Sequence, residues 1–367
     1  MGHSITIKDI ARQAEVSIAT VSRVLNNQGS TKEELRQRVL QAAADLGYFK
    51  TADQGPVARN EKRALKAIGF ILAYSDLEDP PLDTFWSHIL HGAEIEARKS
   101  NTYVTYYGVS LKQPPYLLLS KLHEMRVDGI LLVGSSDLET VLSIQEANFP
   151  LVLVDNAVHI PGQQIDAILS DNYEGAREAV NYLISEGHRQ IAFLGGPTSD
   201  TIQSSQKMIY TFERRRDGYL AALSEAGLPV HRELVVEDCY VNNPAEVYAA
   251  CKRLIASKIP FSAVFCANDP IADKTIKALR ELSLNVPDDV SVIGFDNADI
   301  AEHLTPPLTT VHVHKEAMGA MAVKSLFARI ADPEAIGMTN ILAVELIKRK
   351  SVRSLVKESE TIIVSPN

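Results

Sequence analysis

The chain has 367 residues, of which 46% are hydrophobic and 23% are charged. That length suggests two or three domains, and that composition is typical of a globular protein and excludes a disordered or collagen-like chain. The longest apolar runs, such as 68–73 and 129–134, are far shorter than the roughly 18 to 20 residues that cross a bilayer, and the N-terminus lacks the hydrophobic stretch of a secretory signal. We therefore expect a cytoplasmic protein without a membrane segment.

The formal net charge of −9 hides an asymmetry along the chain. Residues 1–66 carry 11 Lys and Arg against 7 Asp and Glu, whereas the remainder carries 26 against 39. A basic N-terminal part on an acidic body is typical of a module that meets a polyanion. The cysteines, Cys239, Cys251 and Cys266, have no paired spacing, so we expect them to be reduced and structural, with no disulfide framework and no thiolate zinc site.

Two short helices joined by a tight turn are predicted at the N-terminus. The first begins after Thr6, which has an acidic residue three positions on, and carries apolar residues at helical spacing as far as Ala14. Ser17 can cap the second helix, whose inner face is Val21 and Val24. Such a pair of helices predicts a helix-turn-helix unit.

A third helix is predicted over residues 31–47. Thr31 and Glu34 have the spacing of a capping box, a stripe of buried residues runs from Leu35 to Leu46, and Gly47 ends the helix. Three helices in so short a segment complete a small all-α domain.

The outward face of the second helix favours contact with DNA. It carries Ile18, Ala19, Ser22 and Arg23. In a major groove Arg23 could donate two hydrogen bonds to guanine, while Ile18 and Ala19 could touch thymine methyl groups. The alternative is an ordinary solvated helix with one exposed isoleucine.

The N-terminal segment resembles the LacI/GalR family of bacterial transcription repressors. The resemblance is carried by residues 6–27, which include Val-Ser-Ile-Ala-Thr-Val-Ser-Arg-Val-Leu-Asn, and by Leu46-Gly47-Tyr48. It implies a role in binding double-stranded operator DNA for nine residues: Thr6, Ser17, Ile18, Ala19, Ser22, Arg23, Asn26, Tyr48 and Arg59.

The chain departs from the family pattern at two places. Glu15 stands in the first turn where the family usually has glycine, so a left-handed backbone there would cost about 1 kcal/mol. Within residues 51–66, no leucine stands directly after Ala58-Arg59, where the family's hinge helix has the leucine that it inserts into the minor groove, and Val57 and Leu65 are the only nearby substitutes. Arg59 could still contact phosphate. The alternative for this segment is a flexible polar linker.

The body alternates short apolar runs with amphipathic segments. Strands of a first lobe are expected at 68–74, 103–107, 129–133 and 151–154, with helices at 89–100, 117–125 and 138–147. Strands of a second lobe are expected at 167–169, 191–194, 234–237, 263–266 and 290–294, with helices at 174–186, 216–226, 244–257 and 271–282. These segments predict two parallel α/β sandwiches.

Polar residues gather where these predicted strands end. Asp155 follows the strand at 151–154, Asn268-Asp269 follows 263–266, and Asp296 follows 290–294. In open α/β sheets ligands bind outside the carboxyl ends of strands, and carboxylates and amides suit a polyhydroxylated ligand. The alternative for each residue is a helix N-cap, an interpretation we favour for Asp269 and Asp155 over Asn268 and Asp296.

The family resemblance extends over the body and implies a two-lobed, periplasmic-binding-protein-like effector domain. By this resemblance, residues of both lobes bind a small-molecule effector, namely Asp155, Arg215, Asn268 and Asp296. Phe85 and Trp86, expected in the loop before the first helix of this domain, could stack on a sugar ring or belong to the core. Arg215 could instead be a surface arginine of the Arg214–Arg216 run.

The resulting organisation is a multidomain chain. We expect a helix-turn-helix DNA-binding domain at 1–50, a hinge or linker at 51–66, a two-lobed effector-binding and dimerisation domain at 67–353 and a tail at 354–367. The Pro306–Pro307 stretch implies a crossing between lobes, and a helix at 315–330 returns to the first lobe. Because the tail has no leucine heptads, we expect a homodimer.

These features predict a repressor of sugar-utilisation genes whose operator affinity is modulated by a small carbohydrate bound between the lobes. Similarity to the branch containing the evolved-β-galactosidase repressor implies a galactoside or another β-glycoside. The runner-up is a global regulator of the family gated by a protein partner or a nucleobase. An enzyme is disfavoured because no catalytic motif or metal-ligand cluster is evident, and His312 and His314 only alternate along a strand. A transport protein would need a signal peptide, and no cofactor is expected.

Overall fold

The structure of the protein is a computed structural model. It describes residues 5–25, 31–48, 67–74, 84–110, 112–158, 160, 165–196, 210–239 and 243–356. The chain divides into two compact units. Unit 1 comprises residues 1–169 and 315–341, and unit 2 comprises residues 170–314 and 342–367. Each unit is described by itself, as is the three-helix head within residues 5–48.

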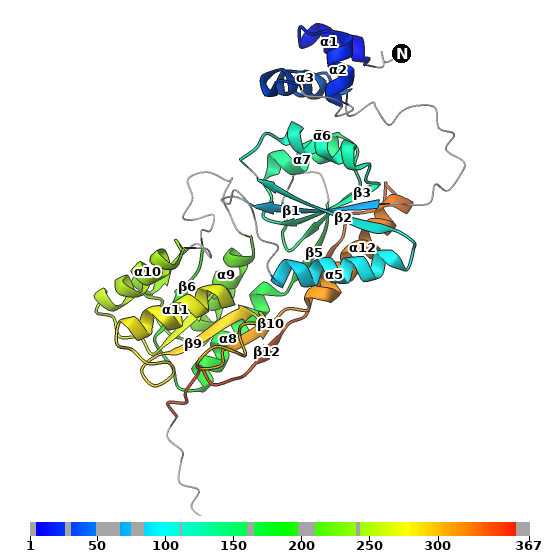
Figure 1. Cartoon of the computed structure of the whole chain (residues 1–367). Coiled ribbons are helices and arrows are strands. Elements are labelled where there is room, and N and C mark those ends of the chain that lie inside the picture. The colour runs from blue at the N-terminus through cyan, green and yellow to red at the C-terminus, as the bar shows by residue number, and fades with distance from the viewer. Residues whose placement is uncertain are drawn as a thin grey trace, which may run out of the picture. The chain divides into compact units, whose positions relative to one another are not determined.

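The head contains the three predicted helices (Figure 1). They are α1 (Ile7–Gln13), α2 (Ile18–Leu25) and α3 (Glu33–Asp45). Their apolar stripes meet in one small core that includes Ile10, Val21, Val24, Val39 and Leu40, all buried. The 3.6-residue periodicity of the sequence therefore identified most of the inner faces, although Ile7 is 38% exposed and Leu35 and Leu46 are only half-buried.

The ends of α3 match the prediction at one side only. Gly47 has a φ of 69°, the left-handed conformation that glycine adopts just past a helix end, as expected. The start differs, because Lys32 rather than Thr31 occupies the N-cap position. The first helical turn contains Glu33 and Glu34, whose charges favour a helix N-terminus.

Unit 1 contains a six-stranded sheet with the order β11-β5-β4-β3-β1-β2. The strands are β1 (Ala67–Tyr74), β2 (Tyr103–Ser110), β3 (Gly129–Gly134), β4 (Leu151–Val154), β5 (Asp166–Ser170) and β11 (Thr339–Leu342). The pairs from β2 to β5 are parallel. β1, β3 and β4 are almost wholly buried, as their continuous apolar runs predict.

β5 lies in unit 1 rather than in the second lobe, where the sequence analysis placed it. It pairs in parallel with β4, with Leu153 opposite Ala167, and the N–H of Ala167 donates to the carbonyl of Met338 beside β11. A short apolar run shows that a strand is buried, but it carries no information on which neighbour the strand pairs with. β11 was not predicted, since its side chains are exposed or half-buried.

Helices cover both faces of this sheet (Figure 1). They are α5 (Thr84–Arg98), α6 (Pro115–Met125), α7 (Leu138–Glu146) and α12 (Lys315–Ala331). α5 packs along α12 at very short range, because a Cβ atom on Gly92 would overlap the carbonyl of Glu316, and one on Gly319 would overlap the carbonyl of Ile89. α12 belongs to unit 1, as predicted for the helix at 315–330.

Unit 2 contains the second six-stranded sheet, with the order β12-β10-β9-β8-β6-β7. The strands are β6 (Ile191–Leu194), β7 (Val235–Val236), β8 (Ala263–Cys266), β9 (Ser291–Asp296), β10 (Thr309–His312) and β12 (Glu345–Ile347). Its helices are α8 (Asn172–Ser185), α9 (Tyr210–Glu225), η1 (Arg232–Leu234), α10 (Pro244–Ala256) and α11 (Asp269–Glu281). α8 packs with α9 and α10 with α11. β12 alone is antiparallel to its neighbour, β10.

The three cysteines lie in unit 2 as free, buried thiols, which confirms their structural role. Burial raises the pKa of the Cys239 and Cys251 thiols to about 12 and also raises that of Cys266. Thiols with so high a pKa form almost no reactive thiolate at neutral pH.

The chain crosses from unit 2 to unit 1 later than expected. Pro306 and Pro307 lie inside unit 2, and the crossing falls between His314 and Lys315. The chain returns to unit 2 between Ile341 and Leu342.

No helix within the described residues is long and apolar enough to span a membrane.

Candidate functional site

The outward face of α2 has the exposure that DNA reading requires. Ile18 is 48% exposed although it begins a helix whose Val21 and Val24 are buried. Ala19 and Arg23 are exposed and Ser22 is half-buried. An arginine beside small and apolar side chains on one accessible helix face can meet both guanine edges and thymine methyl groups.

The start of α2 is fixed by Ser17. The N–H of Thr20 donates to Oγ of Ser17 over 3.1 Å, which is the N-cap contact predicted from the sequence. In the turn before it, Glu15 has a φ of 53°, the left-handed conformation that the family's usual glycine suggested. The turn between α1 and α2 therefore keeps its geometry at the expense of strain in Glu15.

Of the other predicted DNA-contact residues, the structure describes Thr6 and Tyr48. Thr6 is exposed at the start of α1, where its N–H and its hydroxyl both donate to the carboxylate of Asp9, over 2.9 and 2.6 Å. Tyr48 is half-buried just after α3. Asn26 and Arg59 lie outside the described residues, as does the whole predicted hinge at 51–66.

Arg215 forms the centre of the candidate ligand site in unit 2. Its side chain is 2% exposed, which contradicts the alternative of a surface arginine. Nε donates to Oδ1 of Asn172 over 2.7 Å, one terminal nitrogen donates to the carbonyl of Ala267 over 2.6 Å, and the other lies 2.9 Å from Oδ1 of Asp296. The guanidinium also lies 3.8 Å from the centre of the Phe295 ring. These contacts fix both the position and the charge of the guanidinium.

The neighbouring arginines of the Arg214–Arg216 run have other acidic partners than Arg215 does. Arg214 donates to Asp217 over 2.9 Å, and Arg216 donates to the buried carboxylate of Glu237 over 2.9 Å. Arg215, by contrast, contacts Asp296 at the carboxyl end of β9.

Strained backbone marks the strand ends of both units. Asp155, after β4, has a φ of 58°, while Asp296 and Asn297, at the end of β9, have φ values of 103° and 46°. Non-glycine residues in these conformations cost of order 1 kcal/mol or more each and cluster at ligand sites. Asp155 caps no helix, since irregular chain follows it at 156–158, which disfavours the cap interpretation.

The cap interpretation applies to Asn268 rather than to Asp269, the reverse of the expectation. Oδ1 of Asn268 accepts from the N–H of Ile271 over 3.0 Å at the start of α11. Asp269 is fully buried and accepts from the N–H of Ala298 over 2.7 Å and from the hydroxyl of Thr310 over 2.6 Å. Asp269 thus ties the loop after Asp296 to β10.

Phe85 and Trp86 lie in the first turn of α5 rather than in the loop before it. Their rings pack edge to face with centroids 4.8 Å apart, and the Lys315 ammonium lies 5.8 Å from the Phe85 ring. A Cβ atom on Gly134, at the end of β3, would lie 3.6 Å from the Trp86 ring. The pair is half-buried at the carboxyl edge of the unit 1 sheet, where Asp155 also lies.

Sequence reasoning missed the support of Arg215. Asn172 is buried as the first residue of α8, and Phe295 lies within β9. Asn172 lies in the body, over which the family resemblance extends, but a polar residue at a helix start is equally typical of a cap. The stacking of Phe295 gave no sequence signal, because it looks like any core phenylalanine.

Comparison with known proteins identifies both parts of the chain. Residues 6–50 match the model of bacterial regulatory proteins of the lacI family, and residues 180–352 match a periplasmic binding protein-like domain. The probable transcriptional repressor ExuR of Bacillus subtilis (strain 168) is 33% identical over 355 residues, which cover 96% of this chain and 99% of ExuR. The transcriptional repressor PurR of Mannheimia succiniciproducens is 34% identical over 355 residues, which cover 95% and 99%.

A solved structure agrees over nearly the full length. The transcriptional regulator CelR, determined as a complex with cellobiose, superposes with a TM-score of 0.69 at 27% identity and covers 95% of this chain and 99% of its own. The relatives are repressors rather than enzymes, which confirms the expectation of a non-enzymatic function. From its head, its two α/β units and these relatives, the chain belongs to the LacI family of DNA-binding transcriptional repressors.

Proposed function

We propose that the protein represses sugar-utilisation genes and that a small neutral carbohydrate, bound at strand-end residues, changes its affinity for a pseudo-palindromic operator. A repressor of this kind works where the bacterial chromosome lies, in the cytoplasm. Ligand binding changes operator affinity only if the ligand prefers one conformation of the repressor. The same coupling then requires operator DNA to change the affinity for the ligand by an equal factor.

The observation that carries the choice of a neutral sugar is the pairing of Arg215 with Asp296. The two charged groups lie 2.9 Å apart and are 2% and 11% exposed, so the pair is close to neutral as a unit. A ligand carboxylate would have to compete with Asp296 for the guanidinium. A sugar hydroxyl, in contrast, can donate to Asp296 or accept from Arg215 without separating them.

The residues of unit 1 support the same ligand class. Asp155 offers a hydroxyl acceptor, and Phe85 and Trp86 offer half-buried aromatic surface of the kind that packs on the apolar face of a sugar ring. The CelR structure contains cellobiose, a β-linked disaccharide, which supports a β-glycoside for this chain as well. A nucleobase effector or a protein partner is the alternative.

For the head, we propose that α2 reads the operator in the major groove. Arg23 would form the bidentate contact to guanine, while Ser17, Ile18, Ala19 and Ser22 complete the face, and Thr6 and Tyr48 would contact the phosphate backbone. That Asn26 and Arg59 also contact DNA is proposed from the family resemblance alone. Two heads related by a twofold axis read two half-sites, so a pseudo-palindrome is expected.

We also propose that the protein is a homodimer, which exposed apolar residues in unit 1 support. β2 is an edge strand whose Tyr103 is 61% exposed, and Ile95 on the neighbouring α5 is 44% exposed. Edge strands and large exposed apolar side chains are features that a second subunit covers.

The ligand proposal is tested by a thermal-shift screen of the full chain against neutral sugars, sugar acids and nucleobases. A neutral β-glycoside should raise the melting temperature, because a ligand that binds only the native state stabilises it. Asp296→Asn should abolish that shift, while Asp288→Asn, the same change at an exposed position, should retain it. A shift with nucleobases or sugar acids only would overturn the proposal.

The DNA proposal is tested by selecting tight-binding duplexes from a randomised pool. The selected site should be a pseudo-palindrome, and Arg23→Ala should weaken binding to it by about 1–3 kcal/mol and relax preference at one base pair per half-site. Arg38→Ala removes the same charge from an exposed position of α3 and should leave the base preference unchanged. Equal binding to random and selected duplexes would contradict the proposal.

A further inference from the structure

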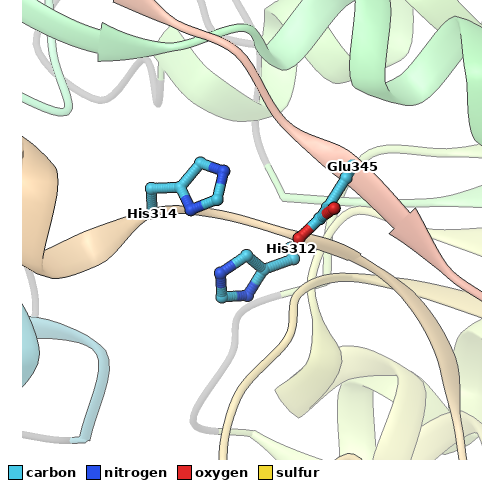
Figure 2. Close-up of side chains that lie close together, drawn as sticks. All are labelled: His312, His314 and Glu345. Atoms are coloured by element: carbon cyan, nitrogen blue, oxygen red, sulfur yellow. The ribbon is translucent and has the colours of Figure 1, made fainter.

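Three potential metal ligands lie together at one edge of the unit 2 sheet. They are His312 at the end of β10, His314 two residues later, and Glu345 at the start of β12 (Figure 2). One possible ligand atom from each residue lies within 4.8 Å of the other two. The two imidazole rings are nearly perpendicular, at 87°, with centroids 4.7 Å apart.

The backbone explains why these residues face one another. His312 projects from one face of the sheet at the end of β10, and the ring of His314, two residues later, packs edge to face against that of His312. Glu345 is the direct partner of His312 in the antiparallel pairing of β10 with β12, so its side chain emerges on that face too. The pairing joins residues more than 30 positions apart, which is why the sequence showed only the two histidines and predicted no metal site.

We propose that His312, His314 and Glu345 bind a divalent transition metal ion such as Zn²⁺, beyond any role of this chain in binding DNA or sugar. Two imidazole nitrogens and one carboxylate oxygen are ligands that zinc and its neighbours prefer. Three protein ligands leave a further coordination position for water. The single carboxylate also offsets part of the charge of the ion.

The geometry needs only a local adjustment. Zinc ligands lie about 2.0–2.2 Å from the ion, so tetrahedral donor atoms are roughly 3.4 Å apart. The observed limit of 4.8 Å therefore requires the side chains to close by roughly an ångström. His314 and Glu345 are exposed, so both can rotate towards His312 without displacing core residues.

The surroundings of His312 assign its ligating nitrogen. Nδ1 lies 3.1 Å from the amide nitrogen of Asn297, whose oxygen accepts from Arg349 over 2.9 Å. Nε2 is therefore the nitrogen that meets the ion. An imidazole that binds through Nε2 carries its proton on Nδ1, so the Asn297 amide must turn when the ion binds, and its oxygen then accepts from Nδ1 in place of Arg349.

An ion at this position would connect the segment of unit 2 that precedes the crossing to unit 1 with the segment that follows the return to unit 2. His314 is the last residue of unit 2 before the crossing to α12, and Glu345 follows the return at Leu342 by three residues. The ion would join the end of β10 to the start of β12. We therefore expect it to stabilise unit 2 against unfolding as well as to bind.

The test is a titration of the full chain, first stripped with a chelator, with Zn²⁺ followed by calorimetry. One ion per chain is expected. Because the loss of an outer hydrogen-bond partner already weakens a metal site by about 10- to 100-fold, His314→Ala and Glu345→Gln should each weaken binding by at least about tenfold. His303→Ala, which removes an exposed histidine of unit 2 outside the cluster, should bind as the parent does.

Two further measurements make the assignment specific. Co²⁺ bound at this site should show visible d–d bands without a thiolate charge-transfer band, because no cysteine takes part. Asn297→Asp should tighten Zn²⁺ binding, since a carboxylate accepts from Nδ1 of His312 and still pairs with Arg349. Absence of stoichiometric binding, or binding unchanged in both His314→Ala and Glu345→Gln, would overturn the proposal.

Discussion

Individual residues carry both strain and charge in this repressor. Glu15 keeps a left-handed turn that glycine would adopt freely, and Arg215 keeps a buried charge that Asp296 neutralises. The turn at Glu15 could be predicted, because departure from the family's glycine occurs at a position of known geometry. The contacts of Asn172 and Asp269 could not, since Asn and Asp near strand and helix ends serve as caps, ligands or internal ties with the same local sequence.

Replacing Glu15 should relieve the strain at the helix-turn-helix turn. Glu15→Gly is expected to stabilise the head by up to about 1 kcal/mol, because glycine adopts a φ of 53° without a Cβ penalty. Hydrogen exchange of the α1 and α2 amides in the full chain measures this. Glu15→Ala keeps the Cβ atom and should give no such slowing of exchange. Equal slowing in both variants would show that the loss of the Glu15 side chain, and not the backbone, is responsible.

His188 should make unit 2 sensitive to mild acid. It is buried between α8 and β6, with Nδ1 2.8 Å from Oγ of Ser262 and Nε2 3.1 Å from the carbonyl of Arg353. Burial lowers its pKa, so the unfolded chain binds a proton at a higher pH than the folded chain does. The contribution to stability is complete above the ordinary histidine pKa of about 6.5 and is lost as the pH falls below it.

The measurement is the urea midpoint of the full chain at pH 7.5 and 5.5, followed by far-ultraviolet circular dichroism. The parent should lose more stability on acidification than His188→Gln, which cannot take up the proton in the unfolded state. An identical pH dependence for the two proteins would exclude His188 as the titrating group.

The helices and strands of the structure match those predicted from the sequence where the pattern of apolar residues was distinctive. Every helix predicted in the head and body is present, and β4, β6 and β8 have the predicted bounds. β11 and β12 were missed because their side chains are exposed or half-buried, so they lack an apolar run. The prediction that β5 belongs to the second lobe was also wrong, because pairing between strands depends on neighbours distant in sequence.

The packing of α5 on α12 should be intolerant of a single methyl group. Gly319→Ala or Gly92→Ala would place a Cβ atom against a backbone carbonyl of the facing helix, which cannot move as a side chain can. We expect a loss of about 3 kcal/mol in the stability of unit 1. His91→Ala, at an exposed position of α5, should cost little. Fluorescence of Trp86, the single tryptophan, reports this unfolding, and an unaltered midpoint for both glycine variants would contradict the close packing.

At the scale of the whole molecule, charge separates the DNA-binding part from the rest. Residues 1–66 have a basic excess, while the remaining residues are acidic, so attraction to DNA should be confined to the N-terminal part. This division could be read from composition alone. The division into two units could not be read from composition, because each unit is assembled from separate stretches of chain.

Operator affinity should therefore fall steeply with salt. If two heads together neutralise 6–10 phosphates, a plot of log affinity against log salt should have a slope of about −5 to −9. Titration of the sugar ligand in the same buffers releases no counterions from DNA and should show almost no dependence on salt. A slope near zero for the selected operator would contradict recognition through the basic N-terminal part.

The interleaved chain has a consequence for synthesis on the ribosome. β11 leaves the ribosome about 170 residues after its partner β5, which at about 5–20 residues per second is a delay of roughly 10 to 30 seconds. Because β12 follows β11 by only a few residues, neither sheet can gain its last strand until the chain has been made as far as these two strands. The nascent protein must therefore keep two unfinished sheets from aggregating until β11 and β12 have been made.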